Sequence, residues 1–147
     1  CEEIKKRGLA VKLDTNGSRP DVIRNLLEKG LLDYIAMDVK TDPKHYFPIL
    51  TKDDDPERIR TSLELIQTAK IAYEFRTTCV RPLVDKKIMT TMAELVAEAP
   101  LYVLQRFRHR EKILSPAFFR DQPDFSEAEL EQLQAVVAPR VKQCLIR

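Results

Sequence analysis

The strongest constraint on the fold is a regular alternation of strand-like and helix-like segments along the 147 residues. Short apolar runs typical of buried strands lie at 9–15, 32–40, 71–80 and 101–107. Between these runs, apolar residues recur with helical spacing, and polar or glycine-containing stretches separate the segments. Strands that are separated by helices predict parallel strands joined by right-handed crossovers. We therefore predict an α/β fold with a parallel sheet, either open or closed into a partial (β/α) barrel.

The C-terminal segment predicts a last helix. Ser126 and Glu129 have the spacing of a capping box, and apolar residues at helical spacing follow them. The helix is expected to run to about residue 146, with Pro139 kinking or ending it. Residues 1–120 are accordingly expected to form the barrel portion, and residues 121–147 a C-terminal helix that packs on it.

The composition narrows the functional class. The formal net charge is only +2, so no overall field favours nucleic acid or a membrane surface. The apolar runs are far shorter than the roughly 20 residues needed to span a bilayer. The three cysteines, at positions 1, 79 and 144, are odd in number and widely spaced, which indicates a reducing, cytoplasmic compartment. None forms a CxxC pair, so we predict no metal site on this chain.

Polar side chains gather at the carboxyl end of each predicted strand. They are Asp14, Thr15, Asn16, Asp38, Lys40, Arg76, Thr77, Thr78, Gln105, Arg106 and Arg108. In parallel α/β folds, ligands bind at this edge of the sheet because the connecting loops meet there. Charged groups are costly to bury unless they are paired. Four neighbouring strands that end in this way predict a shared polar pocket.

Each of these residues also has a simpler explanation when it is taken alone. A single aspartate after a strand is most often a helix cap or a turn former. Lys40 alone would be a solvated loop residue, and Arg76 would pair with Glu74 or with an aspartate on the next strand. Only the joint placement of the residues favours the pocket.

Four motifs in this order resemble the radical S-adenosylmethionine (SAM) activating enzymes of glycyl radical enzymes. They are "KLDTNG" at 12–17, "MDVK" at 37–40, "FRTT" at 75–78 and "LQRFR" at 104–108. Within that family, the anaerobic ribonucleoside-triphosphate reductase activating type is the most similar, and the pyruvate formate-lyase type is a near relative. The resemblance covers nearly the whole chain and weakens after about residue 120. It implies a (β/α)6-type fold of which this chain supplies the last four strands.

The resemblance also implies cofactors and partners. Family members bind a [4Fe–4S] cluster through a CxxxCxxC loop and hold the SAM amino group with a GGE-type motif. Both would lie upstream of Cys1, so the chain is expected to be a C-terminal fragment that cannot by itself cleave SAM. Expected partners are a glycyl radical enzyme, anaerobic ribonucleotide reductase in particular, and a reductant such as flavodoxin or ferredoxin. With its first strands missing, the fragment is expected to expose a sheet edge and to self-associate.

The resemblance further implies a SAM-binding role for the strand-end residues, and no catalytic residue on this chain. Asp14 and Thr15 match residues that lie beside SAM and a small cation. Asp38 and Lys40 match a strand end where the lysine pairs with the SAM carboxylate, and Arg76 matches an arginine near the methionine or ribose. The remaining members of the predicted SAM-binding set are Asn16, Thr78, Gln105 and Arg108.

Two other functions fit the same residues. An aldolase or isomerase fragment would use Lys40 to form a Schiff base with a carbonyl substrate. A degenerate binding module would keep the polar residues and perform no chemistry.

Overall fold

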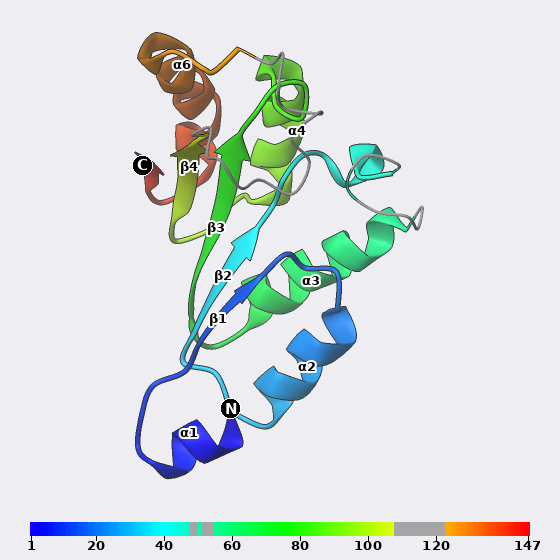
Figure 1. The fold of residues 1–147 in the computed structure, drawn as a ribbon, viewed down its shortest axis with the longest axis vertical. Helices are drawn as coiled ribbons and strands as arrows, with labels where there is room; N and C mark the ends of the chain where they lie inside the picture. Colours follow the sequence, from blue (N-terminus) through cyan, green and yellow to red (C-terminus); the bar gives the residue numbers. More distant parts are fainter. Residues whose placement is uncertain (48–49, 51–54, 108–122) are drawn as a thin grey trace.

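The computed structural model describes residues 1–47, 50, 55–107 and 123–147. Its centre is one sheet of five parallel strands, arranged in the order of the sequence (Figure 1). The strands are β1 (Lys12–Thr15), β2 (Tyr34–Asp38), β3 (Ala72–Cys79), β4 (Tyr102–Arg106) and β5 (Cys144–Ile146). The alternation of strands and helices confirms the predicted α/β class.

Helices connect the strands and cover the sheet. They are α1 (Glu2–Lys6), α2 (Pro20–Glu28), α3 (Pro56–Thr68), α4 (Lys86–Leu95) and α6 (Glu127–Val137), with short 3-10 helices η1 (Pro43–His45) and η2 (Ala138–Arg140). Helix α2 packs beside α3, and α4 packs beside α6 (Figure 1). Their apolar stripes supply buried side chains to the core, among them Ile23, Leu63, Met92 and Leu130.

The two faces of the sheet differ in chemistry, because successive side chains of a strand point to opposite faces. One face is apolar and fully buried in the core, with Ile35, Met37, Phe75 and Leu104. The opposite face, called the polar face below, follows from the strand register. It carries Lys12, Asp14, Ala36, Asp38, Glu74, Arg76, Thr78, Val103 and Gln105.

The C-terminal segment forms a fifth strand, where a continued helix was expected. Helix α6 ends at Val137, and Pro139 lies in the 3-10 turn that follows. Proline has no N–H to continue the helical ladder, so the chain turns back toward the sheet. Residues Cys144–Ile146 then pair with β4, and Gln134 of α6 donates a hydrogen bond from its amide to the Cys144 carbonyl at 2.8 Å.

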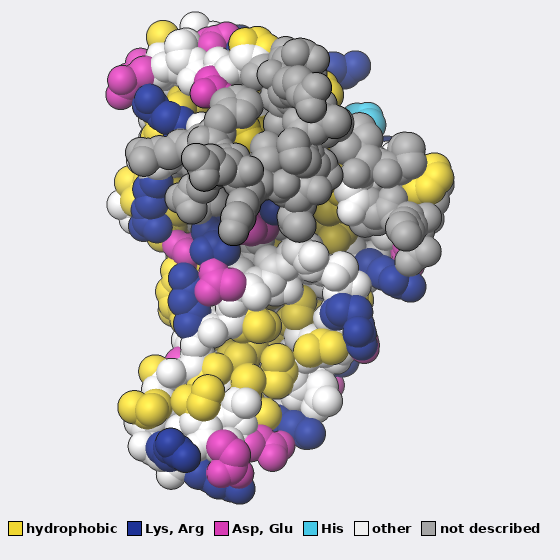
Figure 2. Space-filling model, in the orientation of Figure 1, with side chains coloured by type: hydrophobic (Ala, Val, Ile, Leu, Met, Phe, Trp, Pro, Cys, Tyr) yellow, Lys and Arg dark blue, Asp and Glu magenta, His cyan; other side chains and the backbone are white. Residues whose placement is uncertain are grey.

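Exposed apolar side chains gather near the β1 edge of the sheet. Figure 2 shows hydrophobic side chains over the part of the molecule that contains α1, β1 and α2 in Figure 1. Ile4, Leu9 and Val22 are among the exposed large hydrophobic residues of this region. Among the described residues, no helix is long and apolar enough to cross a membrane.

Candidate functional site

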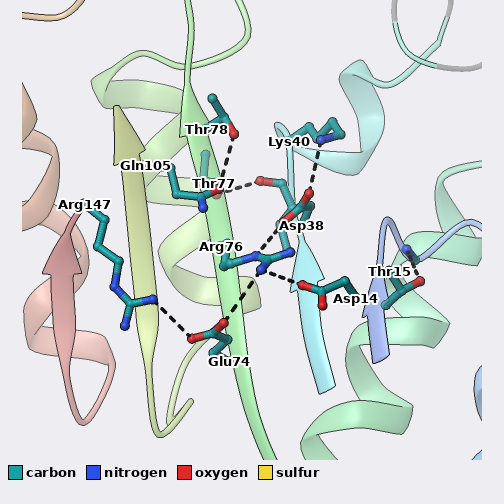
Figure 3. A network of polar contacts seen from close by, with 12 residues as sticks. Asp14, Thr15, Asp38, Lys40, Glu74, Arg76, Thr77, Thr78, Gln105 and Arg147 are labelled. Atoms are coloured by element: carbon teal, nitrogen blue, oxygen red, sulfur yellow. Dashed lines mark hydrogen bonds and ion pairs between the residues drawn. The ribbon is translucent and has the colours of Figure 1, made fainter. Parts of the chain in front are cut away.

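Arg76 is the centre of an ion-pair network at the carboxyl ends of β1, β2 and β3 (Figure 3). Its Nη1 lies 2.6 Å from Asp14 Oδ1, and its Nε donates to Asp38 Oδ1 at 2.8 Å. The arginine side chain is only 16% exposed, whereas the Asp14 side chain is 54% exposed. Among the described residues, the ion pairs of Arg76 use Nε and Nη1. The network is therefore buried at Arg76 and open to solvent at Asp14.

Lys40 extends the network beyond the end of β2. Its ammonium lies 3.5 Å from Asp38 Oδ2, so the two oxygens of Asp38 face different cations, Lys40 and Arg76. The side chains of Lys40 and Asp38 are 38% and 30% exposed. Both remain accessible to a ligand placed over the polar face.

Glu74 extends the network toward the amino end of β3, although it was not among the predicted site residues. Its side chain is buried, and its carboxylate lies 3.6 Å from Lys12 Nζ, 3.8 Å from Arg76 Nη1 and 4.0 Å from Arg147 Nη1. Glu74 and Lys12 precede Arg76 and Asp14 by two positions, so strand alternation places them on the same face. This spacing was the available signal for both residues. For Arg147 there was no signal, because β5 was not predicted.

The charges of the network nearly balance. Three carboxylates, those of Asp14, Asp38 and Glu74, face the cations of Lys12, Lys40, Arg76 and Arg147. Burial alone would lower the pKa of Arg76, but the hydrogen bonds and charges of Asp38 and Asp14 outweigh it and raise this pKa above its ordinary value. The guanidinium therefore stays charged at every physiological pH.

Thr78 and Gln105 lie next to the network on β3 and β4. They are register partners, and Thr78 Oγ1 contacts Gln105 Oε1 at a long 3.4 Å. Figure 3 shows both side chains on the same region of the sheet as Lys40 and Arg76. A hydrogen bond this long is weak, so it holds the hydroxyl and the amide only loosely. The predicted site residue Arg108 lies outside the described residues.

Thr15 and Asn16 serve the turn after β1. Thr15 Oγ1 accepts a hydrogen bond from the Gly17 amide at 3.1 Å, and Asn16 Oδ1 accepts from the Ser18 amide at 3.0 Å. The Ser18 hydroxyl also donates to Asn16 Oδ1 at 2.8 Å. These bonds order the start of α2, so the structure brings together Asp14, Asp38, Lys40 and Arg76 but gives Thr15 and Asn16 partners within their own turn.

Cys79 is buried and Cys144 is partly buried, whereas Cys1 is exposed. Burial raises the pKa of Cys79 to about 12 and that of Cys144 to about 11, so both thiols stay protonated at neutral pH. Across the described ranges of the chain, no group of three or more His, Cys, Asp or Glu side chains has the arrangement of a metal site. The described residues thus include no ligand set for an iron–sulfur cluster.

Comparison with known proteins identifies a curated relative and a similar solved structure. A protein from Methanocaldococcus jannaschii, provisionally named as a glycyl-radical enzyme activating enzyme, is 30% identical over 147 residues, which cover 97% of this chain and 60% of that protein. A solved structure, a domain of pyruvate-formate lyase-activating enzyme from Bacteroides vulgatus, matches with a TM-score of 0.69 and 15% identity. That match covers 99% of this chain and 85% of the solved domain. No protein-family model matches the sequence.

The two similarities support different statements. The solved structure, at its low identity, shows the fold: a parallel sheet with alternating helices of the partial (β/α) type. The curated relative carries the name of a glycyl-radical enzyme activating enzyme, the class of protein that the four motifs resemble. The chain spans about 60% of the length of the curated relative.

Proposed function

We propose that this chain is the SAM-binding C-terminal portion of a radical SAM glycyl-radical-enzyme activase. The observation that carries the proposal is the convergence of Asp14, Asp38, Lys40 and Arg76 from three adjacent strands onto one open, half-exposed network. Three of the four motifs that resemble the family, those on β1, β2 and β3, supply these residues. An ion-pair cluster that served stability alone would not need its acids and its lysine exposed at the ligand-binding edge of a parallel sheet.

The residues fit the chemistry of SAM. This ligand carries an ammonium, a carboxylate, a sulfonium and a ribose, and so requires acids, a base and neutral polar groups that converge. Asp14 and Asp38 offer carboxylate oxygens, and Lys40 offers an ammonium for the SAM carboxylate. Thr78 and Gln105 offer a hydroxyl and an amide beside them. In this assignment the chain binds and orients SAM.

The reactive chemistry belongs to the cofactors. When they are bound in the full protein, SAM and a [4Fe–4S] cluster supply a 5′-deoxyadenosyl radical that abstracts hydrogen from a glycine of a partner enzyme. The cluster would be held by a CxxxCxxC loop encoded upstream of Cys1. Reading the coding sequence upstream of Cys1 tests this directly, and a sequence without that motif contradicts the proposal.

We propose the anaerobic ribonucleotide reductase type of activase, because "RTTCV" and "LQRFR" resemble that type most. Its partners would be the reductase and a cytoplasmic reductant such as flavodoxin or ferredoxin. We also expect the isolated chain to self-associate, because β1 ends the sheet of the described residues and Leu9, just before β1 in the chain, is exposed. Light scattering that shows a monodisperse monomer would contradict self-association.

The decisive experiment measures SAM affinity in the intact protein after anaerobic reconstitution. Asp14→Ala and Lys40→Ala should each weaken SAM binding by about tenfold, the cost of one charged hydrogen bond. Asp21→Ala and Lys44→Ala are matched controls, because they remove the same charges from exposed positions outside the network. Unchanged affinity in both site variants would show that the polar face does not bind SAM.

The aldolase alternative is disfavoured by the surroundings of Lys40. A lysine that forms a Schiff base is usually desolvated in an apolar pocket or placed beside another cation. Lys40 is 38% exposed and paired with the Asp38 carboxylate. Borohydride trapping of a carbonyl substrate on Lys40 would restore this alternative.

A further inference from the structure

The peptide group between Val39 and Lys40 is held on both sides by side-chain hydroxyls. Thr77 Oγ1 donates a hydrogen bond to the Val39 carbonyl at 2.6 Å, and the Lys40 N–H donates to the Tyr46 hydroxyl oxygen at 2.8 Å. The carbonyl of Val39 and the N–H of Lys40 belong to one planar peptide unit. Thr77 and Tyr46 are called the hydroxyl clamp below.

Both members of the hydroxyl clamp are themselves fixed. Thr77 is 1% exposed and Tyr46 is 6% exposed. The single hydroxyl hydrogen of Thr77 goes to Val39, so in its contact with the buried Tyr102 hydroxyl, Tyr102 must be the donor. Burial also raises the pKa of Tyr46 to about 12, so its phenol stays neutral at physiological pH.

The clamped peptide unit lies between two residues of the candidate site. Strand β2 ends at Asp38, and the Val39 N–H still donates to the Arg76 carbonyl at 2.8 Å. Asp38 and Lys40 are two positions apart and meet on the polar face. A rotation of the peptide unit between them would turn Lys40 away from Asp38. Their own ion pair, at 3.5 Å between partly exposed side chains, is too weak to prevent this.

We propose that Thr77 and Tyr46 are positioning residues that hold Lys40 and Asp38 in ligand-binding geometry by clamping the peptide unit between them. The identity of the ligand rests on the proposed function, whereas the clamp itself rests on the two hydrogen bonds. Neither residue belongs to the predicted SAM-binding set. In the structure both are buried, Thr77 on the core side of β3 and Tyr46 within the apolar core cluster. The binding geometry would then depend on hydroxyl groups that never contact the ligand.

The main test is Tyr46→Phe in the intact, anaerobically reconstituted protein. Losing one hydrogen bond to the peptide unit should weaken SAM affinity about fivefold. In a Lys40→Ala background, the same change should have no further effect, because the side chain that the clamp positions is gone. Tyr73→Phe is the matched control, because Tyr73 is a partly buried tyrosine on β3 that packs against Phe75. Thr77→Ser should keep the wild-type SAM affinity, because serine retains the hydroxyl that donates to the Val39 carbonyl. Thr77→Val should bind SAM more weakly, because it lacks that hydroxyl.

A second readout separates the clamp from the ligand. Hydrogen exchange of the Lys40 amide, measured without SAM, should be faster in Tyr46→Phe than in wild type and unchanged in Tyr73→Phe. Equal exchange in Tyr46→Phe and wild type would overturn the clamp. Faster exchange with unchanged SAM affinity would overturn the positioning role. If wild type itself does not bind SAM, the proposed function fails, and the amide exchange still decides whether the clamp exists.

Discussion

Arg76 on β3 and Asp14 on β1 form an ion pair of 2.6 Å that passes over the intervening strand β2. The register places Ala36 of β2 beside Asp14, and Asp38 of β2 beside Arg76. Ala36 is completely buried although it lies on the polar face. Its small side chain leaves room for the guanidinium to reach across the strand. Motifs that are distant in the sequence are thus joined by direct contact.

Enlarging Ala36 should therefore break the network. In Ala36→Leu, the added side chain would occupy the space beneath the Arg76 guanidinium and separate it from Asp14. We expect a loss of about 1–3 kcal/mol in the free energy of unfolding from overpacking, together with weaker SAM binding in the intact protein. Ala36→Ser is the control, because a hydroxyl fits the same space. Chemical denaturation measures the free energy of unfolding, and calorimetric titration measures SAM affinity. Equal values for Ala36→Leu and Ala36→Ser would show that the small size of Ala36 is not what lets Arg76 reach Asp14.

Much of the fold follows from local pattern. The four short apolar runs and the helical spacing between them predicted β1 to β4 and the connecting helices, because strands buried in a parallel sheet are apolar on both faces. Strand β5 was missed because Cys144–Ile146 is too short to show a pattern of its own. Its conformation depends on pairing with β4, a tertiary contact that no local window of sequence contains.

The part of the candidate site that lies at the carboxyl ends of the strands could be predicted from the sequence. Asp14, Asp38, Lys40 and Arg76 follow the rule that ligands bind at the carboxyl edge, and the structure joins them. Asn16 shows where the rule does not discriminate, because its side chain bonds to its own turn instead. The hydroxyl clamp could not be predicted, since it depends on the loop after β2 folding back onto the sheet.

The turn after β1 gives a second prediction, at Gly17. This residue has φ +74, and an added Cβ would approach the buried Met37 Cε, with Ser62 Cβ also close at 3.5 Å. The Gly17 carbonyl also accepts a hydrogen bond from the buried Ser62 hydroxyl at 2.7 Å. Gly8 has almost the same φ, +72, but nothing lies within 4 Å of its added Cβ. The two glycines therefore separate backbone strain from steric contact.

Gly8→Ala should cost about 1 kcal/mol of unfolding free energy, from the left-handed backbone alone. Gly17→Ala should cost at least about 1 kcal/mol more, because Met37 must repack in a filled core. Urea denaturation of both variants measures the difference. If Gly8→Ala and Gly17→Ala lost the same unfolding free energy, the contact with Met37 would not contribute to the cost of the Gly17 substitution.

The start of α6 gives a prediction about pH. Glu129 completes the capping box: its Oε2 accepts hydrogen bonds from the Ser126 amide and hydroxyl, both at 2.9 Å. Its Oε1 accepts a hydrogen bond from Arg81, whose guanidinium stacks 4.1 Å from the Phe125 ring. The Ser126 amide first, then the Ser126 hydroxyl and Arg81, hold the pKa of Glu129 below its ordinary value. The ionised carboxylate therefore ties α6 to the loop after β3.

A carboxyl group with a lowered pKa in the folded state stabilises the protein above its unfolded pKa, about 4.3 for glutamate, and loses that contribution as the pH falls through the folded value. Glu129→Gln should consequently melt at a lower temperature than wild type at pH 7. Its melting temperature should also fall less steeply than that of wild type from about pH 5 to pH 3. Glu131→Gln, an exposed change on the same helix, is the control and should follow the wild-type curve. Thermal melts across this range measure the slopes, and parallel curves for Glu129→Gln and wild type would show that the capping carboxylate does not contribute to acid sensitivity.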